Sequence, residues 1–305
     1  MVGGAVTVLI NNFNYGRYLR QAIDSALAQD YPNVEIVVVD DGSTDESRLV
    51  ITGYAGKITP VLKPNGGQAS ALNAGFAVSK GDIICLLDSD DWFIPGKVRA
   101  LVEAFATCEA ARWVFHPLQR SFPDGSIETK GMATTRFVDE REHATRYGKI
   151  YTSAPPTSGL CFKRELLERL LPMPEEIRIT SDDYLKLGAM SLAPGVYLNT
   201  DLAVQRIHDR NAYTLRADRL PVQARTQLLI AESLKTKFPK LTCLSDHVFA
   251  KGMADYVAAG RRDSLCRAVI WRYIGQAEFG RVADIVARTS YQFIKRHLLS
   301  IAPAE

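Results

Sequence analysis

The stretch Ile-Ile-Cys-Leu-Leu-Asp-Ser-Asp-Asp at residues 83–91 joins the pattern of a buried β-strand to three carboxylates. Its first five side chains are apolar, a run typical of a strand that is buried on both faces. The carboxylates follow at the carboxyl end of this strand, where open α/β sheets bind their ligands. In an extended chain every second side chain shares a face, so we expect Asp88 and Asp90 to point together and Asp91 to point away.

Two converging carboxylates repel each other unless a cation lies between them. Hard oxygen ligands of this kind suit Mg²⁺ or Mn²⁺, which proteins usually share with substrate phosphates. A solvated acidic loop whose aspartates cap a helix is the alternative interpretation. The sequence therefore predicts either a divalent-metal site or a capping loop directly after residue 87.

The first 110 residues alternate between strand and helix patterns. Strand-like apolar runs lie at residues 6–10, 35–40, 58–62 and 82–87. Helical patterns lie between and after them, at residues 18–28, 43–54, 68–79 and 95–105. Strands that alternate with helices of this length indicate βαβ units and a mostly parallel sheet. We therefore predict an α/β fold in which a mostly parallel, nucleotide-binding sheet is flanked by helices.

The pattern changes after residue 113. The sequence then predicts a hairpin within residues 114–127 turning at Asp124-Gly125, helices at 162–171 and 181–190, and a strand at 195–198. From residue 220 to residue 301 it predicts helices only, with breaks at Pro239 and Gly260. We expect one domain over residues 1–215, made of the halves 1–110 and 111–215, and an all-helical C-terminal region over residues 216–305.

Composition limits the function classes. A net charge of +3 over 305 residues is too small to argue for nucleic acid as a partner. The five cysteines show no CxxC spacing, so we expect reduced thiols in a cytoplasmic protein. The apolar run at residues 6–10 is too short for a secretory signal, and no apolar run of about 18 residues predicts a membrane span.

The loop after the first strand begins at Asn11 and lacks the glycine pattern of a dinucleotide-binding turn. This argues against a nicotinamide-dependent dehydrogenase. Phe13 offers instead a flat ring that suits stacking on a nucleobase, although a core aromatic is the plain alternative.

The second and third strands also end in polar residues. Asp40 and Asp41 close the second strand, and Ser43 with Glu46 predicts a capping box for the next helix. The capping box leaves the two aspartates unexplained, and a carboxylate there can accept hydrogen bonds from a base or a ribose. After the third strand, residues 63–68 form a glycine loop whose N–H groups are able to approach phosphate.

Together these segments resemble glycosyltransferase family 2. The resemblance is carried, in order, by residues 6–16, 26–32, 35–45, 65–75 and 87–95. It implies the A-type glycosyltransferase fold, a nucleotide-sugar donor with a UDP-sugar favoured, a divalent metal (Mn²⁺ or Mg²⁺), and inversion at the anomeric carbon. It also makes residues 1–110 the nucleotide-sugar half of the catalytic domain and residues 111–215 the acceptor half.

The resemblance implies roles for single residues. Phe13 would stack on the base, Asp41 would bind it with Asp40 nearby, Asp88 would lie near ribose or metal, and Asp90 would be the direct metal ligand. The remaining donor-binding residues implied by the match are Asn11, Asn65, Gly66, Gly67 and Asn73. Many members have an arginine where this chain has Leu72. That arginine is a possible contact to the phosphate or the base, and Leu72 is unable to make it.

The resemblance continues more faintly toward the acceptor side. Ser158 and Gly159 match the family's acceptor loop, and Asp182 matches its general base. A slip of one residue would select Asp183 as the base instead. His208 matches the histidine that reaches metal or diphosphate, although a lone histidine is more often structural.

The predicted function is transfer of a sugar to an acceptor hydroxyl of a glycan, a polysaccharide or a lipid-linked sugar, by metal-assisted single displacement. One alternative is a catalytically inactive nucleotide-sugar-binding protein of the same fold. A sugar-phosphate nucleotidyltransferase is the other alternative, but it needs a glycine-rich basic loop after the first strand. Here the glycines Gly3 and Gly4 precede that strand.

The C-terminal residues suggest a contact surface. Apolar residues at 282, 285, 286, 293, 294, 298 and 299 are interleaved with the basic residues Arg281, Arg288, Lys295 and Arg296. Such a basic amphipathic helix is able to lie on an anionic membrane, which would suit a lipid-linked acceptor on the cytoplasmic face. Packing on the domain itself or on a second subunit, as in a homodimer, is the commoner use of such a stripe.

Overall fold

The computed structural model describes residues 4–129, 134–209, 211, 218–275 and 277–301, with side chains up to residue 296 in the last range. The chain forms two compact units. The first comprises Met1–Arg141, Tyr151–Arg178 and Asp182–Asn211, and the second comprises Glu142–Ile150, Ile179–Ser181 and Ala212–Glu305. The functional boundary expected after residue 215 stays a prediction. Two short segments from the N-terminal two thirds of the chain, Glu142–Ile150 and Ile179–Ser181, pack with the helical unit.

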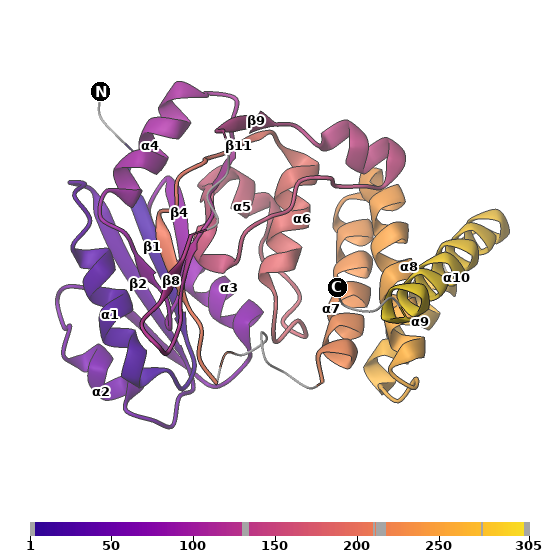
Figure 1. The fold of residues 1–305 in the computed structure, drawn as a ribbon, viewed down its shortest axis with the longest axis horizontal. Coiled ribbons are helices and arrows are strands. Elements are labelled where there is room, and N and C mark those ends of the chain that lie inside the picture. Colours follow the sequence, from indigo (N-terminus) through magenta and orange to yellow (C-terminus); the bar gives the residue numbers. More distant parts are fainter. Residues whose placement is uncertain (1–3, 130–133, 210, 212–217, 276, 302–305) are drawn as a thin grey trace. The chain divides into compact units, whose positions relative to one another are not determined.

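The first unit is built on a sheet with the strand order β3-β2-β1-β4-β10-β6-β11-β9 (Figure 1). Its parallel half consists of β1 (Val6–Asn12), β2 (Val34–Asp41), β3 (Thr59–Lys63) and β4 (Ile83–Asp88). The parallel sheet expected for the N-terminal half is therefore confirmed. Because parallel strands end at one edge, the last residues of β1, β2 and β4 lie side by side.

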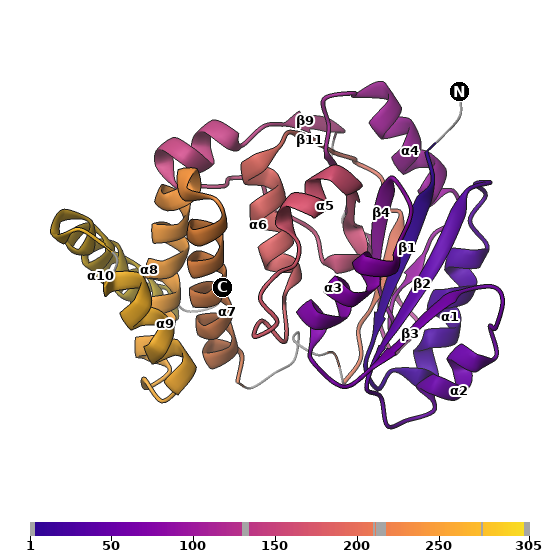
Figure 2. The same ribbon diagram turned by 180° about the vertical axis from the view of Figure 1, so that it is seen from behind.

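Helices cover both faces of this half, as the two opposite views show (Figures 1 and 2). The covering helices are α1 (Gly16–Leu27), α2 (Ser47–Thr52), α3 (Gln68–Val78) and α4 (Lys97–Thr107). Ile10 of β1 packs with α1, whereas its neighbour Leu9 lies against α3, where a Cβ on Gly75 would be 3.0 Å away. Burial on both faces explains why β1, β2 and β4 are continuous apolar runs rather than alternating ones, whereas β3 at the edge of the sheet is largely exposed.

The other half of the sheet is mixed. It contains β6 (Trp113–Phe115), β9 (Arg136–Val138), β10 (Leu160–Lys163) and β11 (Gly195–Tyr197), with β10 antiparallel to both β4 and β6. The helix expected from residue 162 was wrong by two residues, because Phe162 fills a central strand position at 0% exposure. Helix α5 (Arg164–Leu170) begins after this strand, and α6 spans Asp182–Leu192.

A second, small sheet has the order β5-β12-β7-β8. Its strands are β5 (Trp92–Phe93), β7 (Gln119–Ser121), β8 (Ile127–Glu128) and β12 (Ala203–Arg206). The turn expected at Asp124-Gly125 joins β7 to β8, with Gly125 in the left-handed region (φ 84°). The expected partner strand was wrong, because residues 113–115 pair within the large sheet instead.

The capping box expected at Ser43 does not form. Helix α2 begins at Ser47, and the Ser43 hydroxyl instead accepts hydrogen bonds from the Asn12 side chain (3.2 Å) and from Asn14 N (2.9 Å). Glu46 precedes the helix without a side-chain cap, and Asp45 accepts a hydrogen bond from N of Ser47, the first residue of α2, at 3.0 Å. Ser43 therefore ties the loop after β2 to the loop after β1.

The second unit is helical, as the sequence predicts. Its elements are η1 (His143–Tyr147), α7 (Arg219–Lys237), η3 (Pro239–Leu241), α8 (Thr242–Ala258), α9 (Ser264–Gly275) and α10 (Phe279–Ile301). Phe249 stacks on Tyr273 with ring centroids 4.0 Å apart, and the Tyr273 hydroxyl donates to Asp246 at 2.7 Å. The predicted breaks fall at Pro239, which opens η3, and at Gly260, which follows α8 with φ 84°.

Helix α10 has one packed face and one exposed face. Ile285 is buried, and Arg281 and Arg296 pair with Asp246 and Asp255 of α8. The exposed apolar side chains on α10 are Phe279, Val286, Tyr291 and Ile294, while the side chains at 298 and 299 lie outside the described residues. In the described part of the chain, no helix combines the length and the apolar character that crossing a membrane requires.

Candidate functional site

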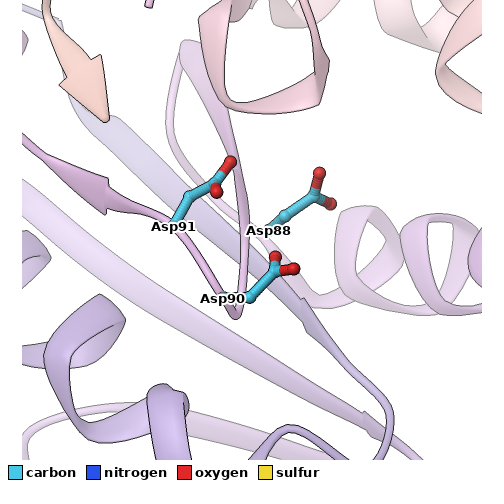
Figure 3. Close-up of side chains that lie close together, drawn as sticks. All are labelled: Asp88, Asp90 and Asp91. Carbon is cyan, nitrogen blue, oxygen red and sulfur yellow. The ribbon is translucent and has the colours of Figure 1, made fainter. Parts of the chain in front are cut away.

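Three carboxylates converge directly after β4. Ligand oxygens of Asp88, Asp90 and Asp91 all lie within 4.8 Å of one another, on the same side of the turn (Figure 3). The expectation that Asp91 points away was wrong. Strand β4 ends at Asp88, and Asp91 N donates to Asp88 O at 3.0 Å, so a turn replaces the extended geometry that would have alternated the side chains.

Close packing of these carboxylates disfavours their charged forms. Burial, followed by the charges of Asp90 and Asp182, raises the pKa of Asp88 to about 7. Burial and the charges of Asp90 and Asp88 likewise raise the pKa of Asp91. Charged oxygens held together against their own repulsion are a donor set that fits a hard divalent cation, and such a cation would reverse both shifts.

Asp90 is the carboxylate of this cluster that meets His208. The histidine Nε2 lies 3.0 Å from an Asp90 oxygen, and the ring is 6% exposed. Tyr18 packs against the ring at a centroid distance of 4.7 Å. Asn211 supports both partners: its Nδ2 donates to Asp90 at 3.2 Å, and its Oδ1 accepts from His208 N at 2.8 Å. The segment after β12 therefore places His208 at the acidic cluster, 118 residues away in sequence from Asp90.

Asp91 joins this cluster to two other segments. It accepts a hydrogen bond from the Ser158 hydroxyl at 2.6 Å and another from Arg206 N at 2.9 Å. The Ser158 hydroxyl in turn accepts from Asp88 N at 3.1 Å. Ser158 and Gly159 are themselves buried, so the hydroxyl of this loop faces the acidic cluster rather than open solvent.

Two cations behind the cluster escaped sequence reasoning. Lys97 is fully buried, and its Nζ donates to Ser158 O at 2.6 Å, while burial lowers its pKa to about 7. Arg206 donates from Nε to Asp90 O at 3.1 Å, with its guanidinium 4.7 Å from the ring centroids of Tyr18 and of Trp92. A lysine two residues after Pro95 was the available signal for the first. For Arg206 the signal was the arginine-x-histidine pattern that it forms with His208.

The carboxylates at the end of β2 are held by the chain itself. Asp41 accepts from Lys63 Nζ at 2.6 Å, from Gly66 N at 2.9 Å and from Gly67 N at 2.7 Å. The expectation that these two glycine N–H groups approach phosphate was therefore wrong, because they point at Asp41.

Asp40 is fully buried and lies in a similar set of hydrogen bonds. Its carboxylate accepts from the Asn12 side chain (3.0 Å), from Ser43 N (3.2 Å) and from Arg48 Nε (3.1 Å). Asp40 therefore holds the loops after β1 and β2 together.

The remaining residues expected to bind the donor differ in exposure and in contacts. The Phe13 side chain is 45% exposed and directly follows Asn12, the last residue of β1, which pairs with Asp40 in the parallel register. Asn11 hydrogen-bonds to Asp88 and opposes the rise of its pKa. Asn73 binds the backbone of Met173 through both its amide nitrogen (2.9 Å) and its oxygen (3.0 Å).

The two candidate bases open helix α6. Asp182 is 8% exposed and forms an ion pair with Lys186, one turn along the helix. The charge of Asp182 contributes to the raised pKa of Asp88, which places its carboxylate near the cluster. The Asp183 side chain is 51% exposed and lies 3.3 Å from Lys186. The charges of both aspartates raise the pKa of Lys186, so this lysine stays protonated.

Comparison with known proteins gives consistent matches. Residues 7–171 match the family model described as glycosyl transferase family 2. An uncharacterized glycosyltransferase of Nostoc sp. (strain PCC 7120) is 40% identical over 215 residues, covering 68% of this chain and 66% of that protein. Chondroitin synthase of Pasteurella multocida (strain Pm70) is 34% identical over 139 residues, covering 45% of this chain and 14% of the synthase. In both cases the match spans less than two thirds of the relative's length.

Solved structures agree on the fold. TarS 1–349 of S. aureus in complex with UDP-GlcNAc superposes with a TM-score of 0.59 at 16% identity, covering 96% of this chain and 92% of that chain. The same protein in complex with UDP gives a TM-score of 0.59 at 16% identity, covering 93% and 78%. The family match covers more than half of the residues and includes β1 to β4 and the acidic cluster. This chain belongs to glycosyl transferase family 2.

Proposed function

We propose that this chain transfers a sugar from a nucleoside diphosphate sugar to an acceptor hydroxyl, with inversion at the anomeric carbon. One observation carries the proposal. Asp88, Asp90 and Asp91 converge at the carboxyl end of β4, with His208 on Asp90 and the charge of Asp182 close enough to act on Asp88. Family membership and the fold support it.

The donor nucleotide binds across the ends of β1 and β2 in this proposal. Phe13 offers an exposed ring for stacking on the base, and Asp41 keeps acceptor capacity on the oxygen that receives Gly67 N. Asn11, Asn65, Gly66 and Gly67 line the same edge, whereas Asp40 and Asn73 shape it through contacts within the chain. A UDP-sugar is favoured because the TarS structures of the same fold contain UDP and UDP-GlcNAc.

Asp90 and Asp88 hold the divalent metal in this proposal, and His208 lies against Asp90 to orient it or to join the ligands. A bound Mn²⁺ or Mg²⁺ supplies positive charge that neutralises the leaving diphosphate. The chain holds these ligands in place: Arg206 and Asn211 fix Asp90, while Ser158 fixes the turn between Asp88 and Asp91. Preorganised groups of this kind need no rearrangement at the moment of reaction.

Asp182 takes the acceptor proton in this proposal. Its carboxylate lies near the acidic cluster, and it forms an ion pair with the Lys186 ammonium. Asp183 is the alternative, but its side chain is half exposed. No covalent intermediate is required, so the reaction is a single displacement in which Asp182 acts on one face of the sugar and the diphosphate leaves from the other.

The acceptor is a glycan, a polysaccharide or a lipid-linked sugar in this proposal. A saccharide acceptor is proposed by analogy with the relatives named chondroitin synthase and hyaluronan synthase. A cytoplasmic location, contact of α10 with the cytoplasmic face of a membrane, and a homodimer through the same helix remain predictions from the sequence. The exposed side chains of Phe279 and Ile294 are the residues that such a contact would cover.

The test is a screen of nucleotide sugars for hydrolysis in the presence of Mn²⁺, with analysis of the products. Release of the nucleoside diphosphate and free sugar supports the proposal, and chelation of the metal should stop it. Release of pyrophosphate would instead indicate a nucleotidyltransferase. Binding without turnover of any donor, with every acceptor class tried, would indicate the inactive binding protein.

A further inference from the structure

A buried lysine lies behind the turn that carries the acidic cluster, and neither the sequence pattern nor the family match assigns it a role. Lys97, the first residue of α4, is 0% exposed. Its Nζ lies 3.5 Å from the centroid of the Phe93 ring and donates to Ser158 O at 2.6 Å. Among the described residues Lys97 forms no ion pair with a carboxylate, although the charge of Asp91 acts on it.

Burial of this kind needs a reason. Taking an ammonium out of water without a carboxylate partner lowers the stability of the fold. An apolar side chain of similar length would fill the same space and pack on Phe93 without that cost. Such a side chain is unable to donate a hydrogen bond to Ser158 O, so this contact is what distinguishes lysine at position 97.

Ser158 carries the contact on to the acidic cluster. Its hydroxyl donates to Asp91 at 2.6 Å and accepts from Asp88 N at 3.1 Å. These two bonds hold both ends of the turn after β4. Ser158 is itself 0% exposed, so its orientation is set by contacts within the chain rather than by solvent. Lys97 and Ser158 thus form one series of hydrogen bonds that ends at the two aspartates.

The other groups near Lys97 offer no alternative role. Its charge interacts with Cys85 and Cys161, whose sulfur atoms lie 3.2 Å from each other, and with His116. All three side chains are 0% exposed, so none of them meets a substrate in this fold. The hydrogen bond to Ser158 O is therefore the contact through which Lys97 is able to act on the site.

We propose that Lys97 is a positioning residue, which holds Ser158 and thereby fixes Asp88 and Asp91 in the arrangement that binds the metal. The inference rests on the proposed function, because the acidic cluster is the metal site there. Lys97 touches neither the metal nor a substrate in it. Groups that orient a ligand from behind change metal affinity when they are removed.

A purely electrostatic role for Lys97 makes the opposite prediction. A positive charge behind the cluster repels a bound cation, so removing the ammonium would then strengthen Mn²⁺ binding. If Lys97 instead positions Ser158, its removal weakens Mn²⁺ binding. The sign of the change therefore separates the two roles.

The experiment is a double-mutant cycle on the full chain. We would measure the dissociation constant of Mn²⁺ by calorimetry, with UDP present, for the wild type, K97M, S158A and the double variant. K163M is the matched control, because Lys163 is a partly buried lysine of the same unit whose Nζ lies 4.8 Å from the Phe105 ring centroid. Circular dichroism and thermal unfolding show which variants are folded, and K97L replaces K97M if K97M is not.

Mn²⁺ binding should weaken roughly tenfold in K97M and roughly 10- to 100-fold in S158A. The double variant should lose no more than about twofold beyond S158A, because Lys97 acts through Ser158. K163M should bind Mn²⁺ as the wild type does. The affinity for UDP without Mn²⁺ should stay within about twofold in K97M, whereas a general loosening of the fold would lower it too.

Tighter or unchanged Mn²⁺ binding in K97M would overturn the inference. Losses that multiply in the double variant, or an equal loss in K163M, would overturn it as well. A wild type that binds no Mn²⁺ in the presence of UDP would instead count against the proposed function itself.

Discussion

The carboxylates at the end of β2 and those at the end of β4 lie at the same edge of one sheet but in opposite electrostatic conditions. Asp40 and Asp41 each receive three hydrogen bonds from the chain. Asp88 and Asp91 have raised pKa values because burial and neighbouring carboxylates disfavour their charges.

The comparison separates carboxylates that stabilise the fold from carboxylates that are available to bind a cation, although both follow the end of a strand. A carboxylate satisfied by N–H groups stabilises the loop that provides them. A carboxylate held beside others without enough positive charge lowers the stability of the free protein and gains it back on binding a cation. We therefore expect changes at Asp88, Asp90 and Asp91 to affect chemistry and metal binding, and a change at Asp40 to affect folding first.

We expect the largest effect on the transfer rate from a change at Asp182, whose charge acts on Asp88 of the acidic cluster. Asp182→Asn should lower the rate of sugar transfer roughly 10²- to 10⁴-fold, since it removes the proposed general base while keeping the shape of the side chain. Binding of UDP with Mn²⁺ should survive. Asp183→Asn is the matched control and should retain most of the activity, as measured with a donor identified in the hydrolysis screen. Retention of the rate in D182N together with its loss in D183N would exchange the two roles.

Asp90→Ala tests whether the carboxylates after β4 bind the metal. We expect a loss of roughly 10³-fold in turnover and the disappearance of activation by Mn²⁺, because the proposed direct ligand of the metal is removed. The midpoint of thermal unfolding without metal should not fall, since one of three repelling carboxylates is gone. A variant that is still activated by Mn²⁺ to the wild-type extent would show that the metal lies elsewhere.

Asp40→Asn is the converse change at β2. The amide replaces one acceptor oxygen by a donor that faces Asn12 Nδ2, Ser43 N or Arg48 Nε, so we expect a loss of about 1–3 kcal/mol in the free energy of unfolding. Urea denaturation measures this loss. Mn²⁺ affinity of the folded variant should stay within about twofold of the wild type. A variant of unchanged stability would contradict the structural role of Asp40.

The smallest expected effect is the pH dependence of metal binding. Without metal, Asp88 has a pKa of about 7, and below that pH the protonated carboxyl must release its proton before it binds a cation. Mn²⁺ affinity should therefore fall by up to about tenfold per pH unit between pH 7 and pH 5, and should level off above pH 8. Affinity that is constant from pH 5 to pH 8 would show that Asp88 is not a ligand.

Much of this arrangement follows from local sequence. The strands β1, β2 and β4 are predictable because burial on both faces makes them continuous apolar runs, and the sheet edge then fixes where Asp41 and Asp88 lie. The turn after Asp88 is not predictable from alternation, because it depends on Ser158 and Arg206 binding Asp91 from distant segments. The hairpin strand at residue 119 was missed for the same reason, since its partner β12 lies more than 80 residues further on.

The cations of the site were the hardest to predict. Lysine and arginine side chains are long, and their patterns along the sequence resemble those of a solvated surface. Lys97 is buried only because Ser158 O and the Phe93 ring receive its ammonium. Arg178 reaches Asn65 from 113 residues away. Such contacts depend on tertiary structure, so the sequence alone does not show which partners these cations reach.

The most direct test of the comparison is Mn²⁺ titration with UDP present, followed by calorimetry and by thermal unfolding on the same samples. The account predicts one Mn²⁺ site per chain in the wild type and in D40N, none of comparable affinity in D90A, and a rise in unfolding temperature with Mn²⁺ only where the site is intact. Equal Mn²⁺ binding by D90A and the wild type, or its loss in folded D40N alone, would contradict the division between the two sets of carboxylates.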